Sequence, residues 1–437
     1  MVLQYTPPKS VPRPTTLVAD ILDLDYQGRG VAKIQGKTWF IENALPQEKV
    51  EVRVVTEKRH YGHAISTHIL SAHPARQVAK CAYYAQCGGC QSQHIPIDMQ
   101  RHAKQQALFQ RLQQLQPQAT LMPMIVAEPW HYRRRVRLSM RFDAKTKQLA
   151  IGLRQKNSQQ IVNLQHCDVL SRPLSQLLPK LHRRFANWSQ PKNLGHIELV
   201  YADNGIAMLV RHTGNLAQTD RTLLHDFAQQ ENVMLFVQDD QHLTQLYGDA
   251  PYYRLGDGSK LHFDIRDFIQ VNATVNQKMI DTALDWLELT PNDSVLDLFC
   301  GMGNFTLSLS RQANLVVGIE GVREMVEKAT RNAEQNQCDN VQFYQANLDQ
   351  PFAKQPWANQ YFNKILLDPP RTGAAFALNA LCELGAEKIL YVSCNPATLV
   401  RDTAILLQHH YRLKKVAMID MFPNTGHLES ISLFEKE

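Results

Sequence analysis

The sequence has none of the features of a membrane or secreted protein. It contains no run of 18 apolar residues, so a membrane-spanning helix is not expected. Its first 16 residues hold four prolines and no apolar stretch typical of a signal peptide, so we expect a cytoplasmic protein. The eight cysteines are too sparse in 437 residues for a disulfide scaffold. We therefore expect them to be reduced thiols, metal ligands or catalytic groups.

The charge is distributed unevenly along a chain of otherwise ordinary composition. Apolar residues at 44% and charged residues at 20% exclude collagen-like, coiled-coil and largely disordered classes. A length of 437 residues predicts two or three domains. Residues 1–150 contain 21 Lys and Arg against 10 Asp and Glu, whereas the remainder is slightly acidic. This asymmetry predicts a polyanion-binding front part; solvated charge without a partner is the alternative.

A small β-barrel is predicted near the N-terminus, after a proline-rich tail over 1–14 that we expect to be flexible. Residues 15–72 contain short segments of period-2 alternation separated by turn residues. The stretch that includes Gly28-Arg29-Gly30 and runs on to Gly62 resembles a TRAM domain, an OB-like RNA-binding barrel. Because basic side chains neutralise phosphates, the RNA-binding candidates in this barrel are Lys37, Lys58 and Arg59.

The central segment, 73–265, is predicted to be an α+β domain. Leucines at helical spacing predict a helix over 98–116, for which the C-terminal domain is one possible packing surface. In the strand around 135–142, apolar residues share one face and arginines share the other. Guanidinium groups on such a face suit phosphate contacts, and a solvated strand face is the alternative. The candidates are Arg133, Arg135, Arg137 and Arg141.

The C-terminal segment, 266–437, is predicted to be a doubly wound parallel sheet. From about residue 290, continuous apolar runs alternate with helical stretches, which is typical of βα units. The last two expected strands, 411–421 and 430–434, have no obvious helix between them. This ending resembles class I methyltransferases, in which an antiparallel hairpin completes a Rossmann-like sheet of seven strands.

The first strand-to-helix turn of this segment predicts a cofactor site. Gly301 and Gly303 allow a sharp turn and a close approach of the backbone to a ligand. Thr306 occupies the third glycine position of the dinucleotide fingerprint, which argues against a pyrophosphate ligand. Glu320 ends the next strand, where a carboxylate can accept hydrogen bonds from ribose hydroxyls. The combination favours S-adenosylmethionine (SAM) over NAD.

Two later strand ends carry further reactive groups. Asp368 and Arg371 enclose a Pro-Pro pair after the fourth strand, where amino-directed methyltransferases have an aromatic residue in place of the arginine. Cys394 follows the fifth strand, and Asn395 and Pro396 suit a helix N-cap and first turn. A thiol near a helix N-terminus can have a lowered pKa and act as a nucleophile. A buried structural cysteine is the alternative.

The motifs together resemble the RNA (uracil-5-)-methyltransferase family, in the family's order. They begin with Phe268-Ile269-Gln270-Val271-Asn272, include the three strand ends above, and finish with the stretch from Phe422 to Glu429. With the TRAM-like front and the cluster of Cys81, Cys87 and Cys90, the resemblance is to the bacterial 23S rRNA subfamily and covers 15–436. It implies that Cys394 is the nucleophile and Glu429 the base. The SAM contacts that it implies are Gln270, Phe299, Asn304, Glu320, Asn347 and Asp368.

The implied chemistry explains these residue types. Addition of the Cys394 thiolate to uracil C6 makes C5 nucleophilic enough to accept a methyl group. Glu429 then removes the C5 proton so that the thiol is eliminated. Asp368 and Arg371 are expected to hold the base, which must be flipped out of its RNA stack.

Three closely spaced cysteines suggest a metal site. Cys81, Cys87 and Cys90 need a fourth ligand, and Cys167 is the only other cysteine before the C-terminal segment. Four thiolates suit zinc or an iron–sulfur cluster, and spacing alone leaves both open. The subfamily resemblance implies a [4Fe–4S] cluster on these four cysteines.

We therefore expect an enzyme that makes 5-methyluridine in 23S rRNA, using SAM. The alternatives are a tRNA uracil-C5-methyltransferase and a metal-sensing RNA-binding protein with an inactive methyltransferase fold. Intact Cys394, Glu429 and glycine loop argue against the inactive protein. We expect a monomer without an obligate protein partner.

Overall fold

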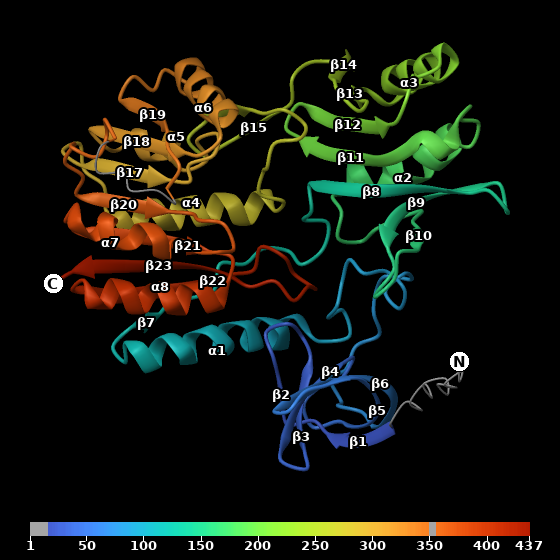
Figure 1. Ribbon diagram of the computed structural model, residues 1–437, viewed down its shortest axis with the longest axis horizontal. Coiled ribbons are helices and arrows are strands. Elements are labelled where there is room, and N and C mark those ends of the chain that lie inside the picture. Colours follow the sequence, from blue (N-terminus) through green and yellow to red (C-terminus); the bar gives the residue numbers. More distant parts are fainter. Residues whose placement is uncertain (1–15, 349–354) are drawn as a thin grey trace, which may run out of the picture. The chain divides into compact units, whose positions relative to one another are not determined.

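A computed structural model describes residues 16–348 and 355–437 (Figure 1). The chain divides into two compact units. The barrel unit contains the chain up to Ala79 with Gln91–Lys104 and Asn424–Gly426, and the large unit contains the rest. The expected tail over 1–14 lies outside the described residues. The proposed domain limits at 72 and 265 remain predictions.

The barrel unit is built on a curled sheet of six strands (Figure 1). Side chains alternate along the strands, so that Trp39, Ile41, Val50 and Val52 fill the interior. Among the strands described in this unit, only β4 and β6 pair in parallel. The order is β1-β5-β6-β4-β3-β2, with β1 Thr16–Asp20, β2 Asp23–Leu24, β3 Gly30–Ile34, β4 Lys37–Glu42, β5 Lys49–Glu57 and β6 Tyr61–Ser71.

The large unit contains a central sheet whose two faces pack against different partners. Leu199, Met208 and Leu235 share one apolar core with α2 (Arg172–Phe185) and α3 (Gln218–Glu231). Leu209 and Phe236, on the other face, belong to the core of the C-terminal segment. The order is β10-β9-β8-β11-β12-β13-β14, with β8 Arg135–Asp143, β9 Gln148–Arg154, β10 Ile161–Asn163, β11 Leu194–Ala202, β12 Gly205–His212, β13 Val233–Gln238 and β14 Leu243–Tyr247.

The second sheet of the large unit has eight strands, whereas the sequence predicted seven. The added strand is β7 (Thr120–Leu121), which pairs in parallel with the free edge of β22. An unpaired strand edge offers backbone donors and acceptors to a neighbouring segment. The order is β19-β18-β17-β20-β21-β23-β22-β7, with β17 Ser294–Leu298, β18 Leu315–Glu320, β19 Val341–Gln345, β20 Lys364–Leu367, β21 Lys388–Ser393, β22 Tyr411–Ile419 and β23 Glu429–Lys436.

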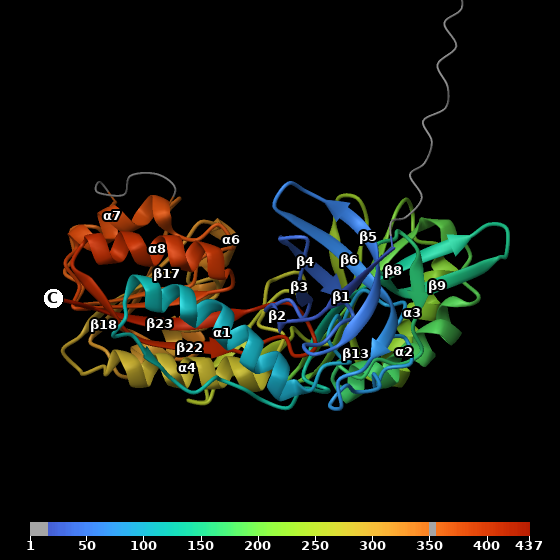
Figure 2. The same ribbon diagram turned by 90° about the horizontal axis from the view of Figure 1, so that it is seen from below.

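The first five of these strands are parallel, and β23 runs antiparallel to both of its neighbours. Helices cover both faces of this sheet, with α7 and α8 on one side and α4 on the other (Figure 2). The doubly wound class is therefore confirmed. The helices are α4 Ala273–Leu287, α5 Thr306–Ser310, α6 Arg323–Gln335, α7 Ala375–Glu383 and α8 Pro396–Gln408.

The predicted helix over 98–116 is confirmed as α1 (Ile97–Leu115). It is shared by the two units, which divide between Lys104 and Gln105. Smaller elements are η1 (Pro191–Asn193) and the hairpin of β15 (Tyr252–Arg254) and β16 (Lys260–His262). Among the described helices, none has the length and apolar character needed to cross a lipid bilayer.

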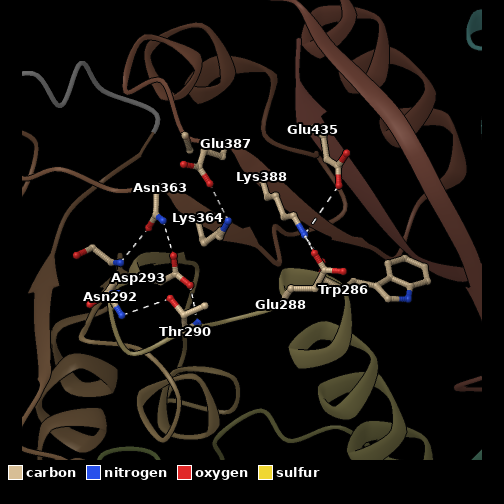
Figure 3. A network of polar contacts seen from close by, with 12 residues as sticks. Trp286, Glu288, Thr290, Asn292, Asp293, Asn363, Lys364, Glu387, Lys388 and Glu435 are labelled. Atoms are coloured by element: carbon tan, nitrogen blue, oxygen red, sulfur yellow. Dashed lines mark hydrogen bonds and ion pairs between the residues drawn. The ribbon is translucent and has the colours of Figure 1, made fainter.

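A polar network fixes the amino ends of the parallel strands (Figure 3). The side chain of Asn363 accepts from the Ser294 amide at 3.0 Å and donates to Asp293. Lys364 pairs with Glu387 at 2.9 Å, at the start of β20. Because these groups satisfy one another, this edge of the sheet is structural. The opposite edge, where the strands end, is where ligands bind in such folds.

Candidate functional site

The loop after β17 forms an open cradle that a single carboxylate holds in place. Gly301 and Gly303 have φ angles of 57° and 99°, which glycine adopts without strain. One Glu320 oxygen accepts from the Gly301 amide at 3.2 Å, and the other accepts from the Val322 amide at 3.0 Å. A Cβ added at Gly301 would meet no described atom within 4 Å. The loop and Glu320 thus lie together, as the sequence predicted.

Asp297 is a buried acid of β17, just before this loop, that sequence reasoning did not assign to the site. Its Oδ2 accepts from the Thr306 hydroxyl at 2.6 Å, whereas Oδ1 has no hydrogen-bond partner among the described residues. Burial raises the pKa of Asp297 to about 7, against the lowering effect of the Thr306 hydrogen bond, and the Asp368 and Glu320 carboxylates add to the rise. An acidic residue inside an apolar strand was the available signal.

Four of the predicted SAM contacts lie at or just after the carboxyl ends of four neighbouring strands. Phe299 follows β17, Glu320 ends β18, Asn347 follows β19 and Asp368 follows β20. The strands are parallel, so these residues share one edge of the sheet. Burial raises the pKa of Asp368 to about 7.

The other two predicted contacts are tied to neighbouring segments. The Asn304 amide exchanges two hydrogen bonds of 3.0 Å with Asn276 and accepts a third from the Tyr253 hydroxyl. Gln270 accepts through its backbone carbonyl from Arg134 Nε at 2.8 Å. Arg134 is buried and lies over the Tyr253 ring at 4.6 Å, a positioning role that sequence reasoning missed.

Cys394 and Glu429 face one another across an antiparallel strand pair. Ser393 at the end of β21 pairs with Ser430 of β23, so the register places Cys394 beside Glu429. Both side chains are half-buried. The sheet therefore brings the predicted nucleophile and base together from positions 35 residues apart in the sequence.

The pKa of the Cys394 thiol is raised, whereas the sequence suggested a lowered one. Burial is the main cause, and the Glu429 and Asp368 carboxylates add to it because they disfavour a second negative charge. Arg371 opposes the rise. The expectation of a lowered pKa considered only the helix N-terminus and was wrong in direction, because tertiary neighbours outweigh it.

The start of α8 connects the loop after β20, which contains Asp368, with the loop after β21, which contains Cys394. Asn395 caps this helix by accepting from the Ala397 amide at 3.1 Å, and its Nδ2 donates to the Arg371 carbonyl at 3.0 Å. One turn later, Arg401 donates to the Thr372 carbonyl at 2.8 Å. These bonds fix the loop that contains Asp368 relative to the loop that contains Cys394.

Asp402 supports the same connection from inside the protein. Its Oδ2 accepts from the Ala374 amide at 2.8 Å and from the Tyr391 hydroxyl at 2.6 Å, while Arg401 binds Oδ1 at 2.7 Å. Asp402 is completely buried. Neither Asp402 nor Arg401 was found from the sequence, because charged residues in a helix usually face solvent.

The four predicted metal ligands lie in the same region of the large unit. Cys87, Cys90 and Cys167 belong to one apolar core cluster, and Cys81 is half-buried. The charges of Cys81, Cys87 and Cys167 influence one another, and burial raises the pKa of all three thiols. Among the described residues, no group of three or more His, Cys, Asp or Glu side chains has a metal-binding arrangement. The iron–sulfur cluster is therefore not confirmed.

The predicted arginine strand is β8, and its alternation is as expected. Arg137 and Arg141 are exposed, opposite buried Val136, Leu138 and Met140. Arg135 is less exposed and is bound by Glu198 at 2.9 Å and by the Ile265 carbonyl at 3.0 Å. Arg137 also pairs with Glu198, at 3.7 Å, and Arg141 donates to the Gln159 carbonyl at 3.2 Å.

Arg133 donates to the Arg135 carbonyl, so it too has a partner within the protein. In the barrel unit, Lys58 and Arg59 are exposed, whereas Lys37 is paired with Glu57. RNA contact by any of these residues remains a prediction.

Comparison with known proteins places the chain in a family. Residues 97–437 match the family described as tRNA (Uracil-5-)-methyltransferase, and residues 15–66 match the TRAM domain. A 23S rRNA (uracil(1939)-C(5))-methyltransferase RlmD of Pasteurella multocida is 85% identical over the full length of both chains. The protein of the same name from Haemophilus influenzae strain Rd is 63% identical over 99% of each chain.

A solved structure supports the fold. The tRNA (uracil-54, C5)-methyltransferase of Pyrococcus abyssi, in complex with S-adenosyl-L-homocysteine, matches with a TM-score of 0.76 at 21% identity. The match covers 95% of this chain and 99% of that one. From its sequence matches, the chain belongs to the tRNA (uracil-5-)-methyltransferase family and carries an N-terminal TRAM domain.

Proposed function

We propose that the protein transfers a methyl group from SAM to C5 of a uridine in 23S rRNA. Full-length relatives named for uracil 1939 of 23S rRNA support this substrate, and we propose the equivalent uridine here. The observation that carries the chemistry is the placement of Cys394 beside Glu429, close to the charges of Asp368 and Arg371. A thiol beside a carboxylate is what addition to C6 and removal of the C5 proton require.

Cys394 acts first, by adding its sulfur to uracil C6. The thiol gives its proton to water before the sulfur adds, and the nearby Arg371 favours the resulting thiolate against the burial and the carboxylates that raise the pKa of Cys394. The electron pair of the C5–C6 double bond moves toward the C4 carbonyl, and C5 becomes the nucleophile. C5 gains the methyl group, for which S-adenosylhomocysteine would be the leaving group, and Glu429 then removes the C5 proton. The C5–C6 double bond re-forms as the C6–S bond breaks, and the thiolate of Cys394 is released.

The described residues fit SAM at the carboxyl edge of the sheet. The open cradle over Gly301 and the unpartnered buried Oδ1 of Asp297 indicate room and an acceptor for a polar ligand among the described residues. SAM would supply the electrophilic methyl group. The residues that would hold it are Gln270, Phe299, Asn304, Glu320, Asn347 and Asp368.

RNA recognition is proposed for basic residues of both units, and the target uridine is proposed to be flipped out of its stack. Unstacking costs a few kcal/mol, which phosphate contacts can offset. Arg137 and Arg141 on β8, and Lys58 and Arg59 on the barrel, are exposed and suited to this role. The four candidate arginines in and just before β8, and Lys37, all have partners within the protein, but Arg137 and Arg141 keep exposed side chains, whereas Arg133, Arg135 and Lys37 are less exposed.

A [4Fe–4S] cluster on Cys81, Cys87, Cys90 and Cys167 is proposed, with zinc as the alternative. The donor set supports either group, since none of these four cysteines is in a disulfide and three of them share an apolar core. Iron and acid-labile sulfide in anaerobically purified protein would support the cluster. The substitution Cys87→Ser should remove the iron. The control Cys338→Ser, at a buried cysteine outside the proposed site, should leave the iron in place. A colourless protein with one zinc per chain would contradict the cluster.

The proposed activity is tested with methyl-labelled SAM and unmodified 23S rRNA and tRNA, transcribed in vitro. Label should enter 23S rRNA at one uridine, and nuclease digestion should release 5-methyluridine. Methylation of tRNA without rRNA would overturn the proposed substrate and support the tRNA alternative. Binding of RNA without methyl transfer to either substrate would contradict an active enzyme.

A further inference from the structure

One outward face of the barrel sheet carries three aromatic rings, Phe40, Tyr61 and His63, which we call the aromatic face. Phe40 of β4 is paired with His63 of β6, and Tyr61 lies two residues before His63 on the same side. The residues between them have the opposite orientation, with Trp39 buried in the barrel core. Tyr61 is 42% exposed. Its ring is therefore available to a ligand.

The aromatic face is held in one arrangement by ring contacts and a cation. The Phe40 ring stacks on His63 at 5.6 Å between centroids, and Tyr61 packs edge-on against both rings, at 6.3 and 5.5 Å. Arg29 lies over Phe40 at 4.7 Å and is fixed by an ion pair with Asp25. A platform that is already ordered loses little conformational entropy when it binds a flat ligand.

Cations gather at one end of the aromatic face. The pairing of Thr38 with Tyr61 brings the turn between β3 and β4 next to the turn between β5 and β6. The Lys37–Glu57 ion pair joins these two turns. This end carries four cations, Lys33, Lys37, Lys58 and Arg59, beside the acidic Glu57, so its charge is positive. Acidic residues are found toward the other end, at Asp25 and Glu42.

Aromatic rings flanked by cations match the chemistry of a single-stranded RNA. Every base has a flat π-face that can stack on an exposed ring, and the connecting phosphates need positive charge. A duplex offers no free base faces. An aromatic cross-strand cluster that serves only the sheet would need neither the exposed Tyr61 ring nor the adjacent cations.

We propose that the aromatic face binds an unpaired segment of the substrate RNA. A base stacks on Tyr61, and Lys58 and Arg59 contact the neighbouring phosphates. The inference rests on the proposed function for the identity of the RNA and assigns to the TRAM domain a stacking role besides electrostatic attraction.

The test uses the full chain and a fluorescein-labelled oligoadenylate, with an RNA duplex of equal length for comparison. Tyr61→Ala should bind the oligoadenylate roughly tenfold more weakly, because one stacked base is lost. Tyr61→Phe should bind normally. The matched control is Tyr361→Ala, since Tyr361 is 70% exposed and precedes β20 in the large unit. The salt dependence should not change, because no phosphate contact is removed.

Duplex binding and methyl transfer separate the possible outcomes. Duplex affinity should be the same for Tyr61→Ala and the wild type, and the KM for 23S rRNA should rise while kcat is kept. Unchanged oligoadenylate affinity in Tyr61→Ala, or an equal loss for the duplex, would overturn the stacking role. If Tyr61→Ala loses affinity for the oligoadenylate but not for the duplex, while the wild type methylates no rRNA, the proposed function is refuted and the stacking role stands.

Discussion

The side chain of Asn395 donates a hydrogen bond from Nδ2 to the backbone carbonyl of Arg371 at 3.0 Å. The same side chain caps α8 through its oxygen. One residue thus fixes the loop after β21, which holds Cys394, to the loop after β20, which holds Asp368. The oxygen and the nitrogen of this amide have different partners. Substitutions of Asn395 can therefore separate the stability of α8 from the positioning of the loop.

We expect Asn395→Ser to keep most of the stability and to lose activity. A serine oxygen can still cap α8, whereas the bond to Arg371 is lost, so kcat should fall roughly tenfold with the loop less well positioned. Asn395→Ala should in addition lower the free energy of unfolding by about 1 kcal/mol. Denaturant unfolding and steady-state methyl transfer measure the two effects. Full activity in Asn395→Ser would show that the bond to Arg371 does not position the loop.

Removal of the Cys394 thiol should abolish methyl transfer and leave SAM binding intact. The thiol is assigned to the uracil base, so its loss removes the C6 adduct without touching the cradle around Gly301. Calorimetry with SAM and a methyl-transfer assay on 23S rRNA test Cys394→Ala. Cys382→Ala is the control, because it alters a buried cysteine of α7. Turnover by Cys394→Ala comparable to the wild type would rule out addition by this thiol.

Loss of the Glu429 carboxylate should stop the reaction after methyl transfer. Glu429→Gln can still allow Cys394 to add to C6, but the adduct keeps its C5 proton and cannot eliminate the thiol. A methyl-labelled protein–RNA complex should therefore accumulate and be visible in denaturing gels. The double variant with Cys394→Ala should show no such complex. Release of methylated RNA at the normal rate by Glu429→Gln would mean that another group is the base.

The buried carboxyl of Asp297 should make stability fall as the pH rises toward neutrality. Its pKa in the folded protein is about 7, above the ordinary value of 3.8, so the folded state binds the proton more tightly than the unfolded state. The stabilisation is present at low pH and is lost as the pH rises through about 7. Asp297→Asn should therefore melt several degrees above the wild type at pH ~8, with a smaller difference at pH ~5.5. A difference that does not depend on pH would contradict this titration.

Asp293→Asn is the matched control, because the pKa of Asp293 is shifted in the opposite direction to that of Asp297. Burial raises the pKa of Asp293, but bonds from Asn363 and Thr290 outweigh it and leave the pKa below its ordinary value. Its stabilisation is present above the unfolded pKa of about 4, so it should be lost equally at pH ~5.5 and ~8. Thermal unfolding of both variants without SAM makes the comparison.

The sequence alone determined the doubly wound fold, and it predicted the cofactor loop and the main reactive residues. Apolar runs alternating with helical stretches require a parallel sheet, and the ends of its strands meet at one edge. Gly301, Glu320 and Asp368 could thus be expected to share a site. Helix α1 and the cap at Asn395 were also predicted, because they depend on local spacing and on short-range hydrogen bonds.

The tertiary structure decided which neighbours each side chain has. The raised pKa of Cys394 depends on Glu429, which arrives through the register of β21 and β23, and register is invisible in a single strand. Arg135 was expected at the surface, but Glu198 of a neighbouring strand binds it. Burial of Asp402 beneath the Asp368 loop likewise has no local signal. Local patterns specify elements and their faces, whereas pKa values and ion pairs depend on contacts between residues distant in the chain.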